Sequence, residues 1–307
     1  MTGDADRRVS RAVTPLSTKA IDLGAPLRFP LKPDATTAVV RAALEEDGAF
    51  NDITTVATVH STARARAKLV ARQAGVVAGV PLALEAFRIL DPTIALRVDL
   101  DDGGVTAAGT QVLFISGHAR GMLAAERVAL NFMQHLSGVA SMTARFVEAV
   151  KGTRVQILDT RKTTPGWRRL EKYAVRAGGG KNHRTDLSAA VLIKDNHLAA
   201  LGGDIAAAVS RARALAPAET KIEVECDRLE QVAAAIAAGA DIVLLDNMTV
   251  DQLRDAVGFV NGRAITEASG GVRLENVRAI ADTGVDWISV GAITHSAGAM
   301  NLALDFE

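Results

Sequence analysis

The sequence predicts an α/β fold, with an N-terminal α+β domain followed by a parallel α/β barrel of about six strands. Beyond residue 150, short β-branched runs alternate with segments of helical period, and this alternation is typical of parallel strands buried on both faces. Before residue 150, the strand-like runs turn at glycines instead. At 307 residues and 49% hydrophobic composition, the chain is long enough for two domains with a substantial core.

The N-terminal domain is expected to open with an amphipathic helix over residues 36–52, "TTAVVRAALEEDGAFND", closing near Gly48. Strands follow in "ARAKLVARQAGVVAGV" and "ALRVDLDDGGVTAAGTQVLFISGHA", and the helix "PLALEAFRIL" lies between them. The next segment, "RGMLAAERVALNFMQHLSGVASMTARFVEAV", is predicted to be helical with a break around Ser137 and Gly138.

Six runs make up the predicted barrel, and helix-like segments such as "LEQVAAAIAAGA" separate the later ones. Six β–α units favour a barrel, which is incomplete at this strand number; an open doubly wound sheet is the alternative. The runs are "VQILDT", "AVLIKDN", "KIEVEC", "DIVLLDN", "AITEASG" and "WISVGA".

Three segments are therefore predicted. Residues 1–28 are polar, with early prolines at Pro15 and Pro26, and indicate a disordered extension. Residues 29–137 form the sandwich-like α+β domain, and residues 138–307 form the barrel domain. The last residues of the chain are expected to pack back on the N-terminal domain.

Charge and cysteine content limit the class of partner. Lys+Arg and Asp+Glu number 35 each, so no global field favours nucleic acid or a membrane surface, and neither is expected as a partner. The single Cys226 excludes an internal disulfide and a multi-cysteine metal site, as expected for a cytoplasmic protein. No signal peptide or transmembrane run is recognisable.

The stretch over residues 159–197 concentrates positive charge, which predicts an anionic ligand. Its cations outnumber its four acids, and Arg161 and Arg184 can each hold a carboxylate or phosphate in a bidentate manner. The alternative for His183 and Arg184 is a solvated loop pair. The cationic side chains are Arg161, Lys162, Arg168, Arg169, Lys172, Arg176, Lys181, His183, Arg184 and Lys194.

Polar residues also end each predicted barrel strand, the face where barrel active sites lie. Glu223 and Glu225 share one face of a strand and Asp246 ends the next, an arrangement suited to Mg²⁺ or sugar hydroxyls. Glu225 and Asp246 are favoured for this role over Glu223; pairing with nearby cations is the alternative. Lys194 follows three apolar residues, so an anionic ligand or a carboxylate partner is expected, although its side chain could also reach solvent.

Two late segments, "ASGGVRLENV" and "SVGAITHSAGAM", put small residues between a strand end and a helix, where backbone N–H groups favour a phosphate. The alternative is that Gly270, Gly271 and Gly291 only form tight turns. Cys226 is interpreted as a core thiol, and His135 and Trp167 as structural residues. Paired histidines at metal-ligand spacing are absent from the sequence, which argues against a zinc enzyme.

Eight ordered motifs across roughly residues 35–306 closely resemble the quinolinate phosphoribosyltransferase family. They are "ERVALNFMQHLSGVAS", "DTRKTTPGWR", "GGGKNHR", "VLIKDNH", "IEVEC", "DIVLLDN", "EASGG" and "SVGAITHS". The sequence departs from the family pattern at Trp167, where a smaller apolar residue is usual, and around Asp186 and Ala189.

The resemblance implies transfer of the phosphoribosyl group of phosphoribosyl pyrophosphate to the ring nitrogen of quinolinate, with release of CO₂ and pyrophosphate. The product would be nicotinate mononucleotide, in NAD biosynthesis. The alternatives are a related phosphoribosyltransferase for another pyridine acid, or a non-catalytic phosphosugar-binding barrel.

The resemblance also assigns roles to residues. It implies that the quinolinate carboxylates are bound by Arg161, His183, Arg184, Lys194 and, from a second subunit, Arg127. Catalytic roles toward the phosphoribosyl donor are implied for Lys162, Glu225 and Asp246, the two carboxylates also holding Mg²⁺. Its 5′-phosphate would be bound by Ser269, Gly270, Gly291 and His295. A homodimer or higher homo-oligomer with shared active sites is expected.

Overall fold

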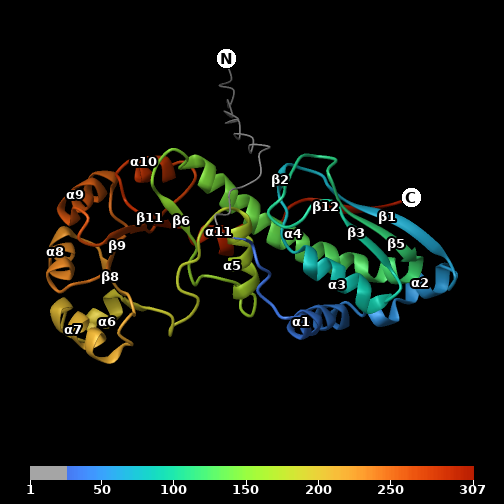
Figure 1. Cartoon of the computed structure of the whole chain (residues 1–307), viewed down its shortest axis with the longest axis horizontal. Helices are drawn as coiled ribbons and strands as arrows, with labels where there is room; N and C mark the ends of the chain where they lie inside the picture. Colours follow the sequence, from blue (N-terminus) through green and yellow to red (C-terminus); the bar gives the residue numbers. More distant parts are fainter. Residues whose placement is uncertain (1–25) are drawn as a thin grey trace, which may run out of the picture.

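The computed structural model describes residues 26–307 as two lobes joined by one long helix (Figure 1). The predicted extension over residues 1–28 lies outside the described residues, apart from Pro26, Leu27 and Arg28, which have no regular structure. Among residues 26–307, no helix has both the length and the apolar character needed to cross a membrane.

The N-terminal lobe is built on a four-stranded antiparallel sheet in the order β12-β1-β5-β3. These strands are β1 (Arg64–Ala71), β3 (Ala95–Val98), β5 (Gln111–His118) and β12 (Leu302–Phe306). Strand β12 comes from the end of the chain and pairs with β1, so that Lys68 lies opposite Asp305. A second small sheet pairs β2 (Gly75–Val76) with β4 (Val105–Thr106).

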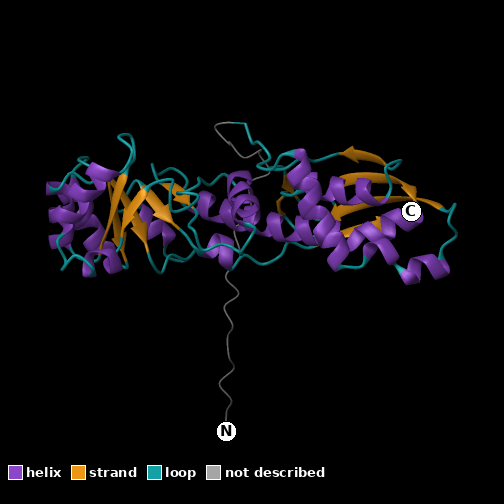
Figure 2. Cartoon of the chain, turned by 90° about the horizontal axis from the view of Figure 1, so that it is seen from below, coloured by secondary structure: helices purple, strands orange, loops and turns teal. Residues whose placement is uncertain are grey.

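Helices of this lobe lie along one side of the sheet (Figure 2). They are α1 (Pro33–Glu46), the 3₁₀ turn η1 (Ala49–Asn51), α2 (Ile53–Thr58) and α3 (Val80–Leu90). The first predicted helix is therefore two elements. Gly48 has φ 67°, a left-handed conformation that glycine adopts without strain. That residue separates α1 from η1, as its sequence position predicted.

Helix α4 (Ala119–Ala149) is continuous through Ser137 and Gly138, so the predicted break is wrong. Glycine is present there because of packing. A Cβ on Gly138 would lie 2.2 Å from the carbonyl oxygen of Gly298, closer than any side chain tolerates. Ser137 is buried and its Oγ accepts the Ala78 N–H at 3.0 Å. The predicted domain boundary at residues 137/138 lies inside this helix.

The second lobe is a six-stranded parallel sheet in the order β6-β11-β10-β9-β8-β7. Every one of the six predicted runs forms a strand: β6 (Gln156–Leu158), β7 (Val191–Ile193), β8 (Ile222–Cys226), β9 (Ile242–Asp246), β10 (Ile265–Ser269) and β11 (Trp287–Ser289). From β7 to β11 the neighbours follow chain order, and β6 closes on β11. This order is that of a curved barrel and not of a doubly wound sheet.

Helices follow the barrel strands, and most of them lie on the outside of the sheet (Figure 1). They are α6 (Asp195–Ala199), α7 (Ile205–Leu215), α8 (Leu229–Ala237), α9 (Val250–Val260), α10 (Val277–Ala281) and α11 (Ala292–His295). Helix α9 illustrates the local signals: the Thr249 hydroxyl accepts the Gln252 N–H, the Gln252 side chain accepts the Thr249 N–H, and left-handed Asn261 ends the helix. Covered on both sides, β9 buries Ile242, Val243, Leu244 and Leu245.

The barrel is open between β6 and β7, which do not pair with each other. The segment that crosses this gap is the basic stretch of the sequence, and it includes α5 (Arg168–Ala177). Its only ladder contact to the barrel is an isolated bridge between Lys181 and Leu158. A buried ion pair between Lys172 of α5 and Asp159 provides a second attachment.

Candidate active site

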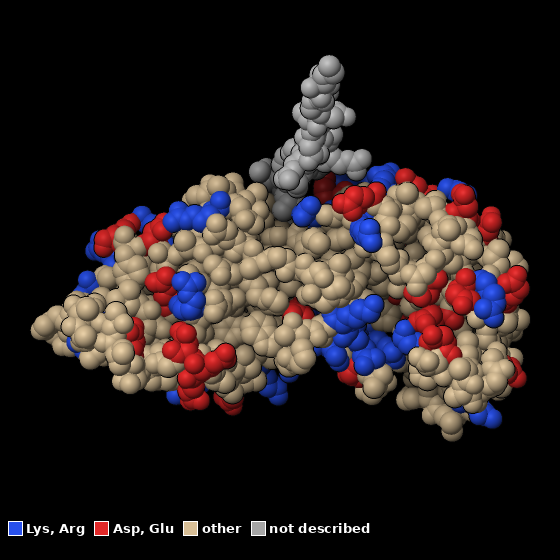
Figure 3. Space-filling view, turned by 180° about the vertical axis from the view of Figure 1, so that it is seen from behind, with Lys and Arg blue, Asp and Glu red and all other residues tan. Residues whose placement is uncertain are grey.

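A cavity of about 590 Å³ lies at the carboxyl ends of the barrel strands. It brings together nine of the predicted site residues, from the basic stretch and from β7 to β10. Lys and Arg side chains gather in a recess near the middle of one face, with acidic side chains beside them (Figure 3). The cavity is lined by Thr160, Arg161, Lys162, His183, Arg184, Leu192, Lys194, Glu225, Leu244, Asp246, Asn247, Glu267, Ser269, Gly270, Gly271 and Ser289.

The period of a β-strand explains which strand residues reach the cavity. Alternate residues of a strand face the same side, and the lining takes such pairs from Leu192 and Lys194 of the β7 end and from Leu244 and Asp246 of β9. Glu225 is aligned with Leu244 across the β8–β9 ladder. The inner face of the barrel thus changes from apolar to polar toward its carboxyl end.

Arg161 and Arg184 form a cationic wall, and neither makes an ion pair with an acidic side chain among residues 26–307. The Nε of Arg161 is buried and has no hydrogen-bond partner among the described residues. Arg184 donates from Nη1 to the Ala190 carbonyl oxygen at 3.0 Å. Burial, followed by the charge of Arg161, lowers the pKa of the Arg184 guanidinium. Two neighbouring guanidinium groups that repel each other form a site prepared for an anion.

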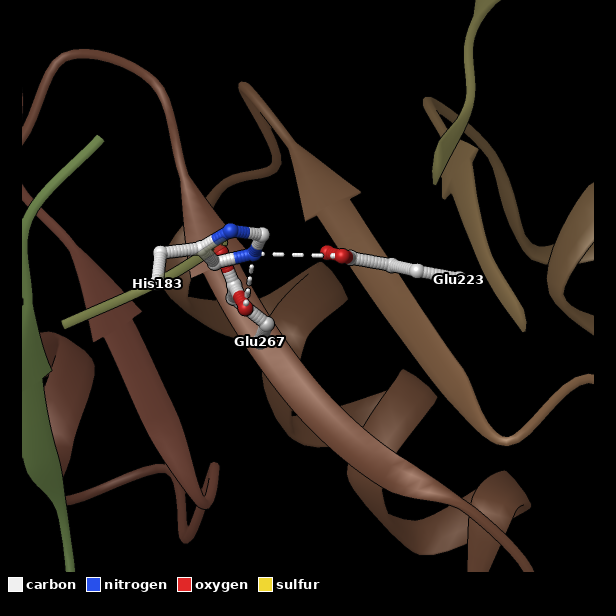
Figure 4. A group of neighbouring side chains, drawn as sticks. All are labelled: His183, Glu223 and Glu267. Atoms are coloured by element: carbon white, nitrogen blue, oxygen red, sulfur yellow. Dashed lines mark ion pairs between the residues drawn. The ribbon is translucent and has the colours of Figure 1, made fainter. Parts of the chain in front are cut away.

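His183 is held by two buried carboxylates from different strands (Figure 4). Its Nε2 lies 3.1 Å from Glu223 Oε2 and 3.4 Å from Glu267 Oε2. Its Nδ1 accepts the Arg184 N–H at 2.8 Å. The Ser289 hydroxyl donates to Oε1 of Glu267. His183 was predicted to bind quinolinate, but both of its ring nitrogens already have partners within the protein.

The protonation of this cluster follows from two opposing effects. Burial disfavours the imidazolium, but hydrogen bonds and attraction from Glu223 and Glu267 outweigh it and raise the pKa of His183 to about 10. The bond that Nδ1 accepts instead requires a ring that is protonated only on Nε2. Burial also raises the pKa of Glu223. In either form of the ring, Nε2 carries the proton that faces the two carboxylates.

Lys194 and Glu225 form an ion pair inside the cavity. The sequence left open whether Lys194 would meet a ligand or a carboxylate, and in this structure it contacts a carboxylate. Asp246 has no such partner among the described residues. Its pKa is raised by burial and then by repulsion from Glu225, and Asn247 donates to its Oδ2 at 2.6 Å.

Two sets of side chains offer metal-ligating atoms. Glu225 and Asp246 supply oxygen donors and repel each other, which fits a hard cation such as Mg²⁺ between or beside them. The ligand atoms of His183, Glu223 and Glu267 also lie within 4.8 Å of one another. That second group faces the cationic wall, since Arg184 acts electrostatically on Glu223, and a further positive charge is disfavoured there.

The predicted phosphate segments end at the same cavity edge. Ser269, Gly270 and Gly271 line the cavity. Gly270 has φ 89°, and a Cβ there would lie 2.1 Å from Asn247 Oδ1, so its turn requires glycine. Helices α10 and α11, which follow the two segments, have only five and four residues, so their dipoles are weaker than the sequence suggested.

Gly291 and His295 lie outside the cavity lining but next to it. A Cβ on Gly291 would lie 3.1 Å from His295 Nε2 and 3.2 Å from Lys162 Cδ, so these two residues adjoin Lys162. Arg127 is exposed on α4 and does not line the cavity. Of the predicted site, the described chain therefore assembles all residues except Arg127 in one region.

The residues that the sequence analysis interprets as structural, His135 and Trp167, lie beside the loop after β6 and hold it in place. His135 Nε2 lies 2.9 Å from Oε1 of fully buried Glu171, whose Oε2 accepts the Thr164 N–H at 3.0 Å. Trp167 stacks on Phe132 with ring centroids 5.2 Å apart. Cys226 is fully buried, and burial raises the pKa of its thiol to about 12, which makes it an unreactive core group.

Sequence reasoning assigned no role to Glu267, although it contacts His183. In the sequence, Glu267 is one of the polar residues near the end of a predicted barrel strand, "AITEASG". Its partner lies in the segment that crosses the barrel gap, and no local sequence pattern reports a contact of that kind.

The fold and this cavity define an α/β-barrel enzyme for small anionic substrates, whose cavity at the strand ends has a cationic wall and a pair of carboxylates. Residues 139–305 match the model of the quinolinate phosphoribosyl transferase C-terminal domain, and residues 52–137 match that of the N-terminal domain. The chain belongs to the quinolinate phosphoribosyltransferase family.

Named relatives agree with this assignment. The chain is 45% identical over 280 residues to a nicotinate-nucleotide pyrophosphorylase [carboxylating] of Mycobacterium leprae, covering 89% of this chain and 97% of the relative. It is 41% identical over 260 residues to a probable enzyme of the same name from Bacillus subtilis, covering 85% and 89%. The solved nicotinate-nucleotide pyrophosphorylase of Francisella tularensis has a TM-score of 0.85 and 39% identity, covering 91% of this chain and 99% of that chain.

Proposed function

We propose that this chain transfers the phosphoribosyl group of phosphoribosyl pyrophosphate to the ring nitrogen of quinolinate. The carboxylate next to that nitrogen leaves as CO₂ and pyrophosphate is released, which gives nicotinate mononucleotide for NAD biosynthesis. Family membership supports the reaction. The observation that carries the assignment of the acid pocket is the buried Arg161 Nε, which has no acceptor among residues 26–307.

Quinolinate is proposed to bind against the cationic wall. Arg161 and Arg184 line the cavity without an ion pair to any acid in the part of the chain that the structure describes. Each can bind one of two adjacent carboxylates in a bidentate manner. Lys194 is near enough to contribute once it exchanges Glu225 for the substrate. Binding a dianion here relieves the repulsion between the two guanidinium groups, which favours a dicarboxylate over a monocarboxylate.

The phosphoribosyl donor is proposed to bind on the opposite side of the cavity. Glu225 and Asp246 would face the ribose, where positive charge develops at the anomeric carbon as pyrophosphate departs. When bound, Mg²⁺ would neutralise the pyrophosphate, with Glu225 and Asp246 as its protein ligands. Lys162 is proposed to contact the donor, and Ser269, Gly270, Gly291 and His295 its 5′-phosphate.

Decarboxylation is proposed to follow transfer of the ribosyl group. The ring nitrogen then carries a positive charge and accepts the electron pair left by CO₂, after which a proton takes the vacated position. The substrate supplies its own electron sink, so no covalent bond to the protein is required. This agrees with the absence of an activated nucleophile in the cavity lining of the described residues.

The assembly is proposed to be a homodimer or a higher homo-oligomer in the cytoplasm, with Arg127 completing the active site of a neighbouring subunit. Exposure of Arg127 on α4, away from its own cavity, supports this role. Neither nucleic acid nor a membrane is proposed as a partner, because the chain carries equal numbers of positive and negative side chains.

Product analysis tests the reaction. The chain is incubated with phosphoribosyl pyrophosphate and quinolinate, nicotinate or nicotinamide, with and without Mg²⁺. Nicotinate mononucleotide from quinolinate, dependent on Mg²⁺, is the expected result. Turnover of nicotinate alone would replace the proposal by a transferase for another pyridine acid. No pyrophosphate release with any of them would indicate a non-catalytic phosphosugar-binding barrel.

A further inference from the structure

His183 precedes Arg184 in the segment that crosses the open side of the barrel. Because this segment has only one bridge to a barrel strand, side-chain contacts must determine where Arg184 lies. Within the described residues, the side chain of Arg184 makes one hydrogen bond, to the carbonyl oxygen of Ala190. The direction of its guanidinium therefore depends largely on the backbone at His183.

The backbone of His183 is fixed by the buried Asp159–Lys172 pair. Asp159 Oδ1 accepts the His183 N–H at 2.9 Å, and Lys172 Nζ donates to the His183 carbonyl oxygen at 3.0 Å. The ring adds a third attachment, since its Nδ1 accepts the N–H of Arg184 itself. Rotation of this ring would thus move the amide that starts Arg184.

The other side of the ring is held by Glu223 and Glu267. The two carboxylates come from β8 and β10, on either side of β9, and meet at the single atom Nε2 (Figure 4). Glu223 is 2% exposed and Glu267 is 0% exposed. Oε1 of Glu223 has no hydrogen-bond partner among the described residues, and Oε2 of Glu267 has only its 3.4 Å ion-pair contact with His183. Both carboxylates lie within ion-pair distance of the same ring nitrogen of His183.

Stability alone does not account for two such carboxylates. Buried charges with incomplete hydrogen bonding are often less stable than apolar residues of similar size. We propose that Glu223 and Glu267 are positioning residues of the quinolinate pocket. Acting through Nε2 of His183, they fix the His183–Arg184 turn so that the guanidinium of Arg184 faces the acid. This inference rests on the proposed function, in which Arg184 binds a substrate carboxylate.

The test measures binding and turnover in the Glu223→Gln and Glu267→Gln variants, which keep the side-chain size and remove the charge. Calorimetric Kd values are obtained for quinolinate and for phthalate, which has the same two adjacent carboxylates but no ring nitrogen. The Kd for both acids is expected to rise on the order of tenfold or more, because a misplaced Arg184 loses its charge-assisted bonds to a carboxylate. The KM for phosphoribosyl pyrophosphate should change less than about twofold.

Coupling to His183 separates positioning from general destabilisation. In a His183→Gln background, each glutamate substitution is expected to add less than about a twofold change in Kd. The imidazole through which the glutamates act on Arg184 is then already absent. Asp91→Asn is the matched control: Asp91 is 6% exposed and its Oδ2 lies 3.1 Å from His118 Nδ1, in the N-terminal lobe. It should leave both acid Kd values unchanged.

Several results would overturn the inference. One is an equal loss of affinity for the acids and for phosphoribosyl pyrophosphate, and another is full additivity with His183→Gln. A third is a wild-type Kd in both glutamate variants. If the cluster bound a metal instead, a chelator would change the phthalate Kd of the wild type and would not change that of the glutamate variants. Failure of the wild type to convert quinolinate would instead refute the proposed function, and the phthalate measurements would still decide the positioning role.

Discussion

Lys194 and Glu225 are paired across neighbouring strands, at the point where the cationic side of the cavity meets the side that carries Glu225 and Asp246. The β7–β8 ladder places Ile193 opposite Val224, so the next residues of both strands adjoin and their side chains form an ion pair. Without substrates, each group neutralises the other. In the proposed complex with both substrates, Lys194 would turn to a carboxylate of quinolinate and Glu225 would face the donor.

This pairing predicts the effect of removing the Glu225 charge. Glu225→Gln should lower kcat more than about tenfold, because a carboxylate near the anomeric carbon matters most as charge develops there. The Kd for quinolinate should not rise, since Lys194 is released from its partner. Single-turnover rates and calorimetry measure the two quantities separately. Wild-type turnover with unchanged Mg²⁺ dependence would remove Glu225 from the mechanism.

The cationic wall predicts a loss that is specific to the acid substrate. Arg161→Ala and Arg184→Ala should each cost about 1.5 to 3 kcal/mol of quinolinate binding, the usual value of a charge-assisted hydrogen bond. The KM for phosphoribosyl pyrophosphate should change little. Arg184→Lys should recover only part of the affinity, because an ammonium group cannot bind a carboxylate through two parallel bonds. Equal damage toward both substrates would contradict an acid pocket.

The environment of Asp246 predicts that its substitution changes the Mg²⁺ concentration needed for activity. Its pKa is raised by burial and by repulsion from Glu225, and a bound cation would relieve both. Asp246→Asn should therefore raise the Mg²⁺ concentration needed for half-maximal turnover while the Kd for quinolinate stays close to wild type. Titration of activity with Mg²⁺ checks this. An unchanged midpoint would show that Asp246 is not a metal ligand.

The raised pKa of Asp102, which lies at the contact between the lobes, predicts that the stability of the protein changes with pH. It accepts the Tyr173 hydroxyl at 2.6 Å and the Val80 N–H at 3.0 Å, and burial raises its pKa from 3.8 to about 6. Between these values the native state binds more protons than the unfolded state. The free energy of unfolding should therefore fall as pH rises from about 4 to about 6.

Comparison with Asp102→Asn isolates this contribution from the other carboxyl groups. Urea unfolding is measured at several pH values, and the difference in free energy between the wild type and the variant should decline through this window. Tyr173→Phe, which removes the hydroxyl and keeps the carboxyl group, should preserve a pH-dependent difference from Asp102→Asn. A constant difference between wild type and Asp102→Asn from pH 4 to pH 7 would contradict a raised pKa.

The barrel could be predicted from sequence because each of its strands is a local signal. Strands buried on both faces require continuous apolar runs, and Ile242 to Leu245 is such a run. The α4 helix was predicted with a break because Gly138 usually weakens a helix. Gly138 is needed because Gly298, 160 positions away in the sequence, packs against it. The residues around Gly138 in the sequence do not indicate a contact of this kind.

The candidate site divides in the same way. Glu225 and Asp246 could be located because carboxyl ends of adjacent parallel strands meet at one edge of the sheet. The pairing of His183 with Glu223 and Glu267 could not, because it depends on how the segment crossing the barrel gap folds back. Sequence spacing identifies the groups that a cavity contains, but the partner of each group is set by distances between segments.

The last prediction concerns Arg127, which the fold leaves exposed on α4 and outside its own cavity. If a neighbouring subunit receives it, the Arg127→Ala and Glu225→Ala variants should complement each other. Each variant alone is expected to be nearly inactive. After subunit exchange, a mixed dimer has one site with both defects and one site with neither. Random 1:1 mixing makes half of the dimers mixed, so about a quarter of the wild-type activity should return. If Arg127 acted within its own subunit, every site would keep one defect and no activity would return. Native mass spectrometry of the mixture must establish that exchange has occurred. Proven exchange without recovered activity would refute a shared active site and leave the proposed reaction intact.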